Sequence, residues 1–148
     1  MDKLAPFLTV LAMGVMVALQ GPTNAMVGRS VAAPAFAALL SLAVSAAIMA
    51  ALLLVTSNRP QLGALAALPW YGWLAGLYGA AIVLGAMVAV PKLGAGPALV
   101  AALVAQTVVG LGVDHLGLFG LPRSPVTPLK LGGLGVMAGG ALMIAARR

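Results

Sequence analysis

Three polar side chains that could take part in chemistry lie close together in this sequence. Asp114 is the only acidic residue apart from Asp2, and the neighbouring His115 is the only histidine. Gln106 precedes them by about two helical turns, in an otherwise apolar segment. Ionisable groups at membrane depth are rare and usually face a cavity or a partner. Because desolvation disfavours the charged form of a carboxyl group, Asp114 could exchange a proton for a substrate, with His115 as a relay.

A structural role fits the same residues. Asp114 falls at the end of the apolar segment, where it could cap a helix or pair with Arg123 or Lys130. His115 is equally typical of the headgroup region at the end of a span. We favour this structural interpretation because buried acids are rare, and we keep Asp114 as the only embedded acid that could couple transport to protons.

Two amides form a second candidate site near the end of the first apolar segment. Gln20 and Asn24 are four residues apart and therefore share one face of a helix. Gly21 and Pro22, which lie between them, would kink or interrupt that helix. A broken helix beside polar side chains is one way to build a substrate site at membrane depth. The alternative, which the sequence favours equally, is that the span ends here and both amides lie in the interface.

Aromatic residues cluster at the start of the third apolar segment. Trp70, Tyr71 and Trp73 begin it, and amphipathic rings at the end of a span typically form the aromatic belt of a membrane protein. We prefer that interpretation. The alternative places Trp73 and Tyr78 in a pocket, where their rings could stack on a substrate cation.

The composition places all of these residues in a membrane protein. Of the 148 residues, 63% are apolar and 7% are charged, against about 25% charged residues in a soluble domain. Five segments are long and apolar enough to span a bilayer, and each should be a helix because unpaired strand edges are not satisfied in lipid. We expect one all-α transmembrane domain over residues 1–148, with helices at about 4–27, 32–55, 70–90, 95–113 and 129–146.

The same composition excludes several other classes of protein. The net charge of +6 comes from eight Lys and Arg residues that are spread thinly, mostly one to a loop. This pattern indicates interfacial anchors rather than a nucleic-acid surface. The absence of cysteine excludes disulfides and thiolate metal sites. We expect no enzyme activity, no metal and no cofactor, and a multi-pass location in a bacterial inner (plasma) membrane.

The positive charges are balanced between the two faces of the membrane. Five spans place the chain ends on opposite faces, so that each face receives four Lys or Arg residues. They are Lys3, Arg59, Arg123 and Lys130 on the N-terminal face, and Arg29, Lys92, Arg147 and Arg148 on the other. Because a bias of cations sets orientation, this tie predicts dual topology and an antiparallel homodimer, which is an inverted repeat made from two chains. The alternatives are that terminal cations lie too far out to count, or that a partner fixes the orientation.

Three segments of the chain resemble a known family. They are QGPTNAMVGRSV, PWYGWLAGLYGAAIVLGAMVAVPKLGAG and AQTVVGLGVDHLGLFGLPRSPVTPLKLGGLGVMAGG. The resemblance covers nearly the whole chain, and the Asp-His-x-Gly-Leu-Phe-Gly-x-Pro stretch is fairly specific. The family that they resemble is the YdcZ-like family of the drug/metabolite transporter superfamily.

This resemblance implies about five helices, and relatives that occur as single dual-topology genes, paired genes or fused halves. The small multidrug resistance exporters, which are more distant relatives, use a membrane-embedded glutamate in the first helix. This chain has no glutamate, so their mechanism does not transfer to it directly. By resemblance, five polar residues match the family pattern: Gln20, Asn24, Gln106, Asp114 and His115.

Together these observations predict a secondary transporter that moves a small metabolite or an organic cation by alternating access. Gln20, Asn24 and Gln106 would hydrogen-bond the substrate, Trp73 and Tyr78 would line its pocket, and the Asp-His pair would carry any coupled proton. The expected partners are a second copy of the chain, the lipid bilayer and the small-molecule substrate. A dual-topology ion channel and a structural membrane subunit are the alternatives.

Overall fold

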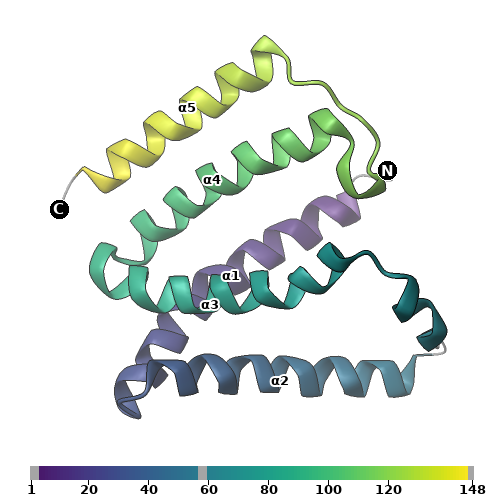
Figure 1. The fold of residues 1–148 in the computed structure, drawn as a ribbon. Helices are drawn as coiled ribbons and strands as arrows, with labels where there is room; N and C mark the ends of the chain where they lie inside the picture. The colour runs from purple at the N-terminus through teal and green to yellow at the C-terminus, as the bar shows by residue number, and fades with distance from the viewer. Residues whose placement is uncertain (1–3, 57–59, 147–148) are drawn as a thin grey trace. The chain divides into compact units, whose positions relative to one another are not determined.

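The computed structural model describes residues 4–56 and 60–146, which form helices and contain no strand. The α-helices are α1 (Leu4–Ser30), α2 (Pro34–Val55), α3 (Leu74–Leu93), α4 (Ala95–Leu116) and α5 (Pro128–Ala145) (Figure 1). Three short 3-10 helices accompany them: η1 (Leu62–Ala67), η2 (Trp70–Trp73) and η3 (Leu118–Gly120). The prediction of an all-helical chain with five membrane-spanning helices is confirmed for the described residues.

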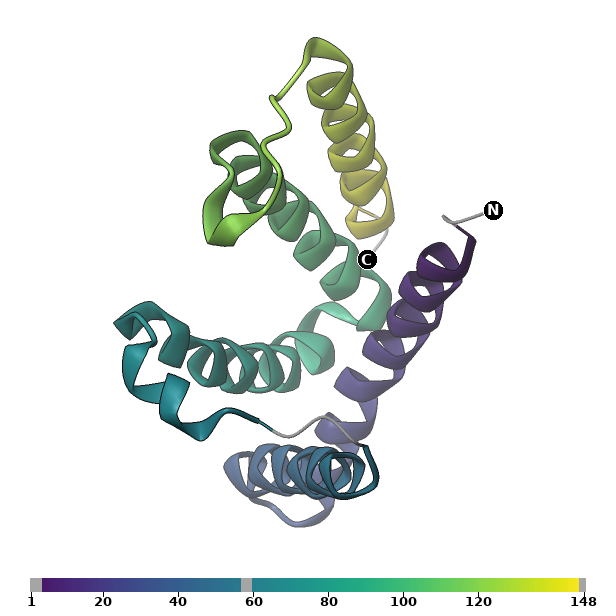
Figure 2. The ribbon, with the colours of Figure 1, turned by 90° about the vertical axis from the view of Figure 1, so that its right-hand side faces the viewer.

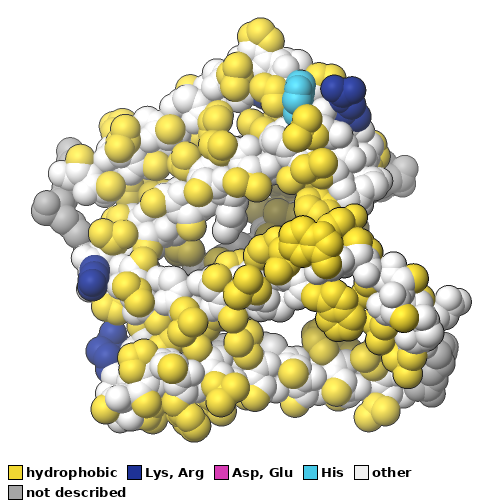
Figure 3. Space-filling model, viewed as in Figure 1, with side chains coloured by type: hydrophobic (Ala, Val, Ile, Leu, Met, Phe, Trp, Pro, Cys, Tyr) yellow, Lys and Arg dark blue, Asp and Glu magenta, His cyan; other side chains and the backbone are white. Residues whose placement is uncertain are grey.

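Apolar side chains cover the outside of these helices rather than an internal core. Each of the five candidate spans is apolar over its length, from 18 residues in α5 to 27 in α1. The buried apolar residues in the described part of the chain are Ala25, Ala37, Ala38, Val83 and Met87. Figure 3 shows apolar side chains spread over the visible face, with few Lys or Arg residues among them. Apolar surface of this extent marks contact with a membrane or with another protein chain, and the length of these helices suits a membrane.

Proline and glycine set several of the helix boundaries. Pro34 and Pro128 begin α2 and α5, where the missing N–H costs nothing and the fixed φ suits a helix. Gly117 ends α4 with a left-handed φ of 64°, which is the common conformation for the residue after a helix. Gly94, with a φ of 83°, separates α3 from α4.

Helix α1 runs without interruption through Pro22 and ends at Ser30. The sequence predicted a kink or an interruption at this point, and the interruption does not occur. Pro22 has no N–H, so the carbonyl of Ala18 loses its usual helical partner. The helix continues because unpaired backbone groups are costly in lipid, and because the small residues on both sides of Pro22 pack closely against neighbouring helices.

The described part of residues 1–91 forms one unit, in which α1 and α2 pack as a hairpin. Two backbone hydrogen bonds close the turn: Ala32 N–H donates to the Arg29 carbonyl at 3.2 Å, and Ala33 N–H donates to the Gly28 carbonyl at 3.1 Å. This is the Schellman arrangement of a helix end. Ala32 has the left-handed φ of 52° that glycine usually supplies, a conformation that costs an L-residue about 1–2 kcal/mol.

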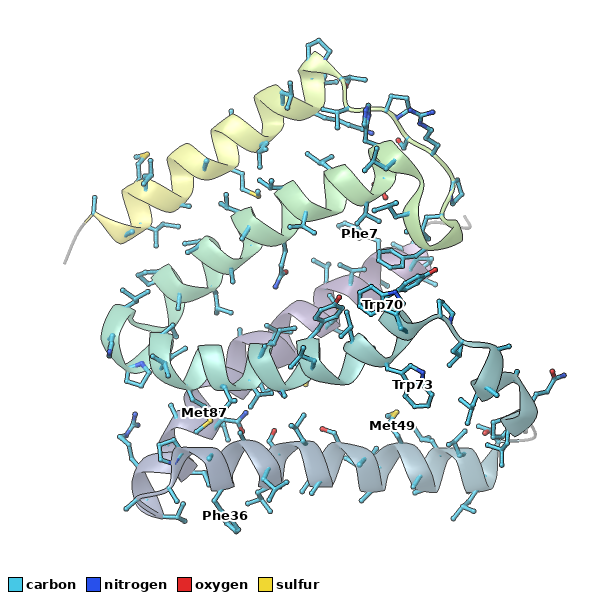
Figure 4. All side chains as sticks on the ribbon, viewed as in Figure 1. Phe7, Phe36, Met49, Trp70, Trp73 and Met87 are labelled. Carbon is cyan, nitrogen blue, oxygen red and sulfur yellow. The ribbon has the colours of Figure 1, made fainter. Side chains whose placement is uncertain are left out.

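Two glycines on α1 allow other parts of this unit to approach closely. A β-carbon at Gly28 would lie 2.8 Å from the Cε of Met87 and 3.2 Å from the Cα of Pro34. One at Gly21 would lie 3.2 Å from the Cγ2 of Val90. Figure 4 shows Met87 extending from α3 into this region. The small core of the unit consists of Ala37, Ala38, Val83 and Met87, with Val27 packed against it.

The described part of residues 92–148 forms the second unit, in which α4 and α5 lie side by side (Figure 1 and Figure 2). The hydroxyl of Thr107 on α4 donates a hydrogen bond to the Sδ of Met137 on α5 at 3.9 Å. Thr127 caps the start of α5, where its Oγ1 accepts a hydrogen bond from the N–H of Lys130 at 3.3 Å. The organisation of the whole chain as a single domain stays a prediction.

Half of the cations in the charge count lie outside the described residues: Lys3, Arg59, Arg147 and Arg148. The other four are described. Arg29 and Lys92 lie in the last turns of α1 and α3. Arg123 lies in the connection after α4, and Lys130 lies in the first turn of α5. Two of the four described cations therefore belong to each predicted face of the membrane.

Candidate functional site

A buried amide on α1 requires an explanation. Asn24 lies on the helix face that contains Gly21, Ala25 and Gly28, and its side chain is 7% exposed. Its Nδ2 is buried without a hydrogen-bond partner among the described residues. A buried donor left unsatisfied costs about 1–3 kcal/mol, and native structures hold few such groups. Asn24 is therefore a candidate to bind a hydrogen-bond acceptor on a substrate.

A hollow of about 340 Å³ lies beside the last turns of α1. Its described lining residues come from α1, the turn after it, the start of α2 and the end of α3: Ala25, Gly28, Arg29, Ala32, Pro34, Met87 and Pro91. Arg29 is the charged residue in this set. Its guanidinium makes no hydrogen bond or ion pair with a described residue, so its donors are free to bind a ligand.

The other two predicted amides are exposed. Gln20 lies one turn before Asn24 on α1, but Gln20 is exposed whereas Asn24 is buried. Gln106 is exposed on α4, next to Thr107, whose hydroxyl donates to the Leu103 carbonyl at 2.9 Å. The assignment of both glutamines to substrate binding stays a prediction.

The aromatic residues at the start of the third span are also exposed. Trp73 is 64% exposed and Tyr78 is 54% exposed, and Figure 4 shows Trp73 on the side of η2 towards α2. Trp70 and Tyr71 meet edge to face, with ring centroids 6.0 Å apart. Exposed rings at the start of a span suit an interfacial belt. The placement of Trp73 and Tyr78 in a substrate pocket stays a prediction.

The connection between α4 and α5 folds back onto the last residues of α4 (Figure 2). The carbonyl of Asp114 accepts a hydrogen bond from the N–H of Ser124 at 2.8 Å. The Nδ1 of His115 accepts one from the N–H of Val126 at 3.1 Å. The carbonyl of His115 accepts a third from the Nε of Arg123 at 2.8 Å. His115 therefore holds this connection against the end of α4 through two hydrogen bonds that it accepts. The Nδ1 accepts one of them through its lone pair.

The cations that could have paired with the Asp114 carboxylate bond elsewhere. Arg123 donates to a backbone carbonyl, and the Nζ of Lys130 donates to the Ser124 hydroxyl at 2.8 Å and the Pro125 carbonyl at 3.0 Å. The carboxylate forms no ion pair with any residue in the described ranges. It lies in the last turn of α4, where the helix dipole does not favour a negative charge. Structural pairing therefore does not account for Asp114.

Sequence reasoning missed Arg29 and the hollow beside it. The available signal was a stripe of small residues at helical spacing, Gly21, Ala25 and Gly28, which ends next to Arg29. Such a stripe indicates a face where another helix approaches closely. The residues that α3 contributes to the hollow, above all Met87, depend on how α3 packs. The sequence around Met87 does not predict this contact.

Five apolar helices define the class of protein: a multi-pass membrane protein. The family model described as "Putative inner membrane exporter, YdcZ" matches residues 5–143. The chain belongs to this family, and the resemblance seen in its sequence is confirmed. It is a multi-pass protein of the inner membrane, in a family whose description is that of an exporter. No curated protein and no solved structure matches the chain.

Proposed function

We propose that two copies of the chain, inserted in opposite orientations, form an exporter that works by alternating access. Membership of an exporter family supports transport. Because the number of spans is odd, the two ends of the chain lie on opposite faces of the membrane. A second, inverted copy would complete the two-fold arrangement that many alternating-access transporters use. The observation that carries the transport role is the unpartnered amide of Asn24, because a buried donor in a lipid-covered helix bundle suits a substrate site.

Reconstitution of the purified chain in proteoliposomes tests this function. We expect saturable uptake and exchange of a small organic probe, chosen from benzoate, benzamide and benzylammonium, which share one apolar body. Asn24→Leu should lose most of this transport at equal protein insertion. Thr9→Val is the control, because the Thr9 hydroxyl bonds only to the Ala5 carbonyl of its own helix. Flux that rises in proportion to probe concentration without saturating would contradict a transporter and indicate a channel.

We further propose that Asp114 couples export to protons. Asp114→Asn keeps the size of the side chain but cannot exchange a proton, so a pH gradient should no longer drive accumulation of the probe. Exchange of probe across the membrane without a gradient should persist. Asp2→Asn is the matched control, because Asp2 is the only other acidic residue, and it should keep both activities. Full gradient-driven transport by Asp114→Asn would exclude this role.

A further inference from the structure

The hollow beside the end of α1 combines one unpaired cation with apolar walls. Arg29 offers five N–H donors, and none of them is engaged by a described residue. The other walls are built from alanine, glycine, proline and methionine residues of the same unit. Ligand pockets in proteins are mostly apolar, with a few polar groups that fix the orientation of the ligand. This hollow therefore suits a ligand with one charged end and an apolar body.

We propose that the hollow binds a small organic anion, whose carboxylate pairs with Arg29 and whose compact apolar body fills the space beside it. The proposal rests on the export function and narrows its substrate to an anion. A guanidinium can hold a carboxylate through two parallel hydrogen bonds, which sets its orientation as well as its charge. The volume of about 340 Å³ lies near the lower end of the range for small-molecule pockets, roughly 300–1,000 Å³. The body must therefore be small.

The charges of this unit disfavour a cationic ligand. No acidic residue occurs between Asp2 and Asp114, so a cation in the hollow would meet Arg29 without a counter-charge. Like charges repel, and no acidic side chain in the described part of this unit offsets the charge of Arg29. Trp73 and Tyr78, whose rings could hold a cation, are not among the described lining residues. The organic cation that the sequence suggested does not fit this site.

Asn24 does not line the hollow, but it neighbours residues of α1 that do. It is adjacent to Ala25 and one turn before Gly28, and both of these residues line the space. A carboxylate oxygen is an acceptor only, which is what the unpartnered Nδ2 of Asn24 needs. Met87 lies against Gly28 at this point, and its unbranched side chain adapts readily to a new neighbour.

A simpler role for Arg29 must be separated from this one. A cation in the last turn of a helix offsets the helix dipole, and cations at the ends of spans anchor them in the interface. Lysine serves both of these purposes. A carboxylate clamp, in contrast, needs the planar fork of the guanidinium. Arg29→Lys and Arg29→Gln therefore distinguish the two roles.

The binding of three matched probes tests the proposal. The full chain, purified in phosphatidylcholine nanodiscs, is titrated with benzoate, benzamide and benzylammonium in a calorimeter. We expect saturable binding of benzoate, and affinities at least tenfold lower for the neutral and cationic probes. Arg29→Gln should weaken benzoate binding by about tenfold or more, with Arg29→Lys between the two. Arg123→Gln, the same change at an arginine outside the hollow, should bind benzoate as the parent does.

Equal binding of benzoate and benzylammonium, or unchanged benzoate binding by Arg29→Gln, would overturn the proposal. Nanodiscs that contain phosphatidylglycerol identify a lipid occupant: if this anionic lipid abolishes the Arg29-dependent binding of benzoate, the hollow is a headgroup site and the proposal fails. Arg29-dependent binding of benzoate by a chain that transports no probe would refute the export function alone. Saturable transport that is insensitive to Arg29→Gln would refute only this site.

Discussion

Asn24 and Arg29 lie five residues apart on one helix and share an unusual property. Each offers hydrogen-bond donors that no described residue accepts, although Asn24 is buried and Arg29 is exposed. A buried amide without a partner lowers stability, and a chain under selection for stability alone would be expected to replace it with an apolar residue. Its presence in a lipid-covered unit is consistent with a role in binding.

Asn24→Leu is expected to increase stability while it removes transport. Leucine fills a similar space without a donor to satisfy, so the free energy of unfolding should rise by about 1–3 kcal/mol. Thermal unfolding of the purified chain in nanodiscs measures this change, alongside uptake in proteoliposomes. A loss of stability with full transport would instead show that Asn24 has a structural role.

His115 is expected to hold the connection between α4 and α5 in place. His115→Leu removes the acceptor for the Val126 N–H, whereas His115→Asn keeps an acceptor oxygen. Loss of one such hydrogen bond should loosen the connection and increase the rate of tryptic cleavage after Arg123 by up to about tenfold. His115→Asn should stay close to the parent rate. Cleavage after Lys92 is the internal control, and equal rates after Arg123 in all three chains would contradict this role.

Some of these residue roles could be predicted from the sequence and others could not. Asn24, Asp114 and His115 were candidates because polar residues are rare in apolar segments, whatever the fold. The burial of Asn24 beside an exposed Gln20 depends on which elements pack against α1, and the spacing of four residues cannot predict it. The hydrogen bonds of His115 join residues 115 and 126 through an irregular connection, for which the sequence has no periodic signal.

At the scale of the elements, the packing of α1 depends on glycine. Gly28 and Gly21 let other parts of residues 1–91 approach α1, and the hollow lies directly beside Gly28. The five helices themselves were predictable, because an apolar segment of about 20 residues has few alternatives in lipid. The effect of Pro22 on α1 was left open by the residue types. Proline removes one helical hydrogen bond, whereas the continuity of the helix depends on the packing on both sides of it.

Gly28→Ala and Gly14→Ala are expected to have opposite effects on stability. Gly28→Ala brings a β-carbon against the Cε of Met87 and the Cα of Pro34, and such overpacking costs about 1–3 kcal/mol. Gly14 lies on the same helix with nothing within 4 Å of the added carbon. Gly14→Ala should therefore be neutral or stabilise by up to about 1 kcal/mol through helix propensity. Thermal unfolding in nanodiscs compares the two.

A second substitution checks the cause of the Gly28→Ala effect. Met87→Ala, added to Gly28→Ala, removes the Cε that would make the shortest contact. The double variant should therefore lose less stability than the sum of the two single variants. Strict additivity would show that Met87 and the new β-carbon do not collide.

At the scale of the whole molecule, the account depends on the orientation of the chain in the membrane. The four described cations divide equally between the predicted faces, with Arg29 and Lys92 on one and Arg123 and Lys130 on the other. An even distribution gives no preferred direction of insertion. Because all five spans are helical and apolar, either direction buries the same surface in lipid. Opposite insertion of two copies would then supply the inverted repeat that one copy lacks.

Two single cysteines in this cysteine-free chain measure orientation directly. Gln61→Cys lies between α2 and α3, and Ala146→Cys lies after α5, so alternating spans place them on opposite faces. Each is labelled in intact cells with a membrane-impermeant maleimide, before and after permeabilisation. Dual topology predicts that both sites are labelled in roughly half of the molecules, and in all of them after permeabilisation. Full labelling of one site with full protection of the other would show a single orientation and contradict the antiparallel homodimer.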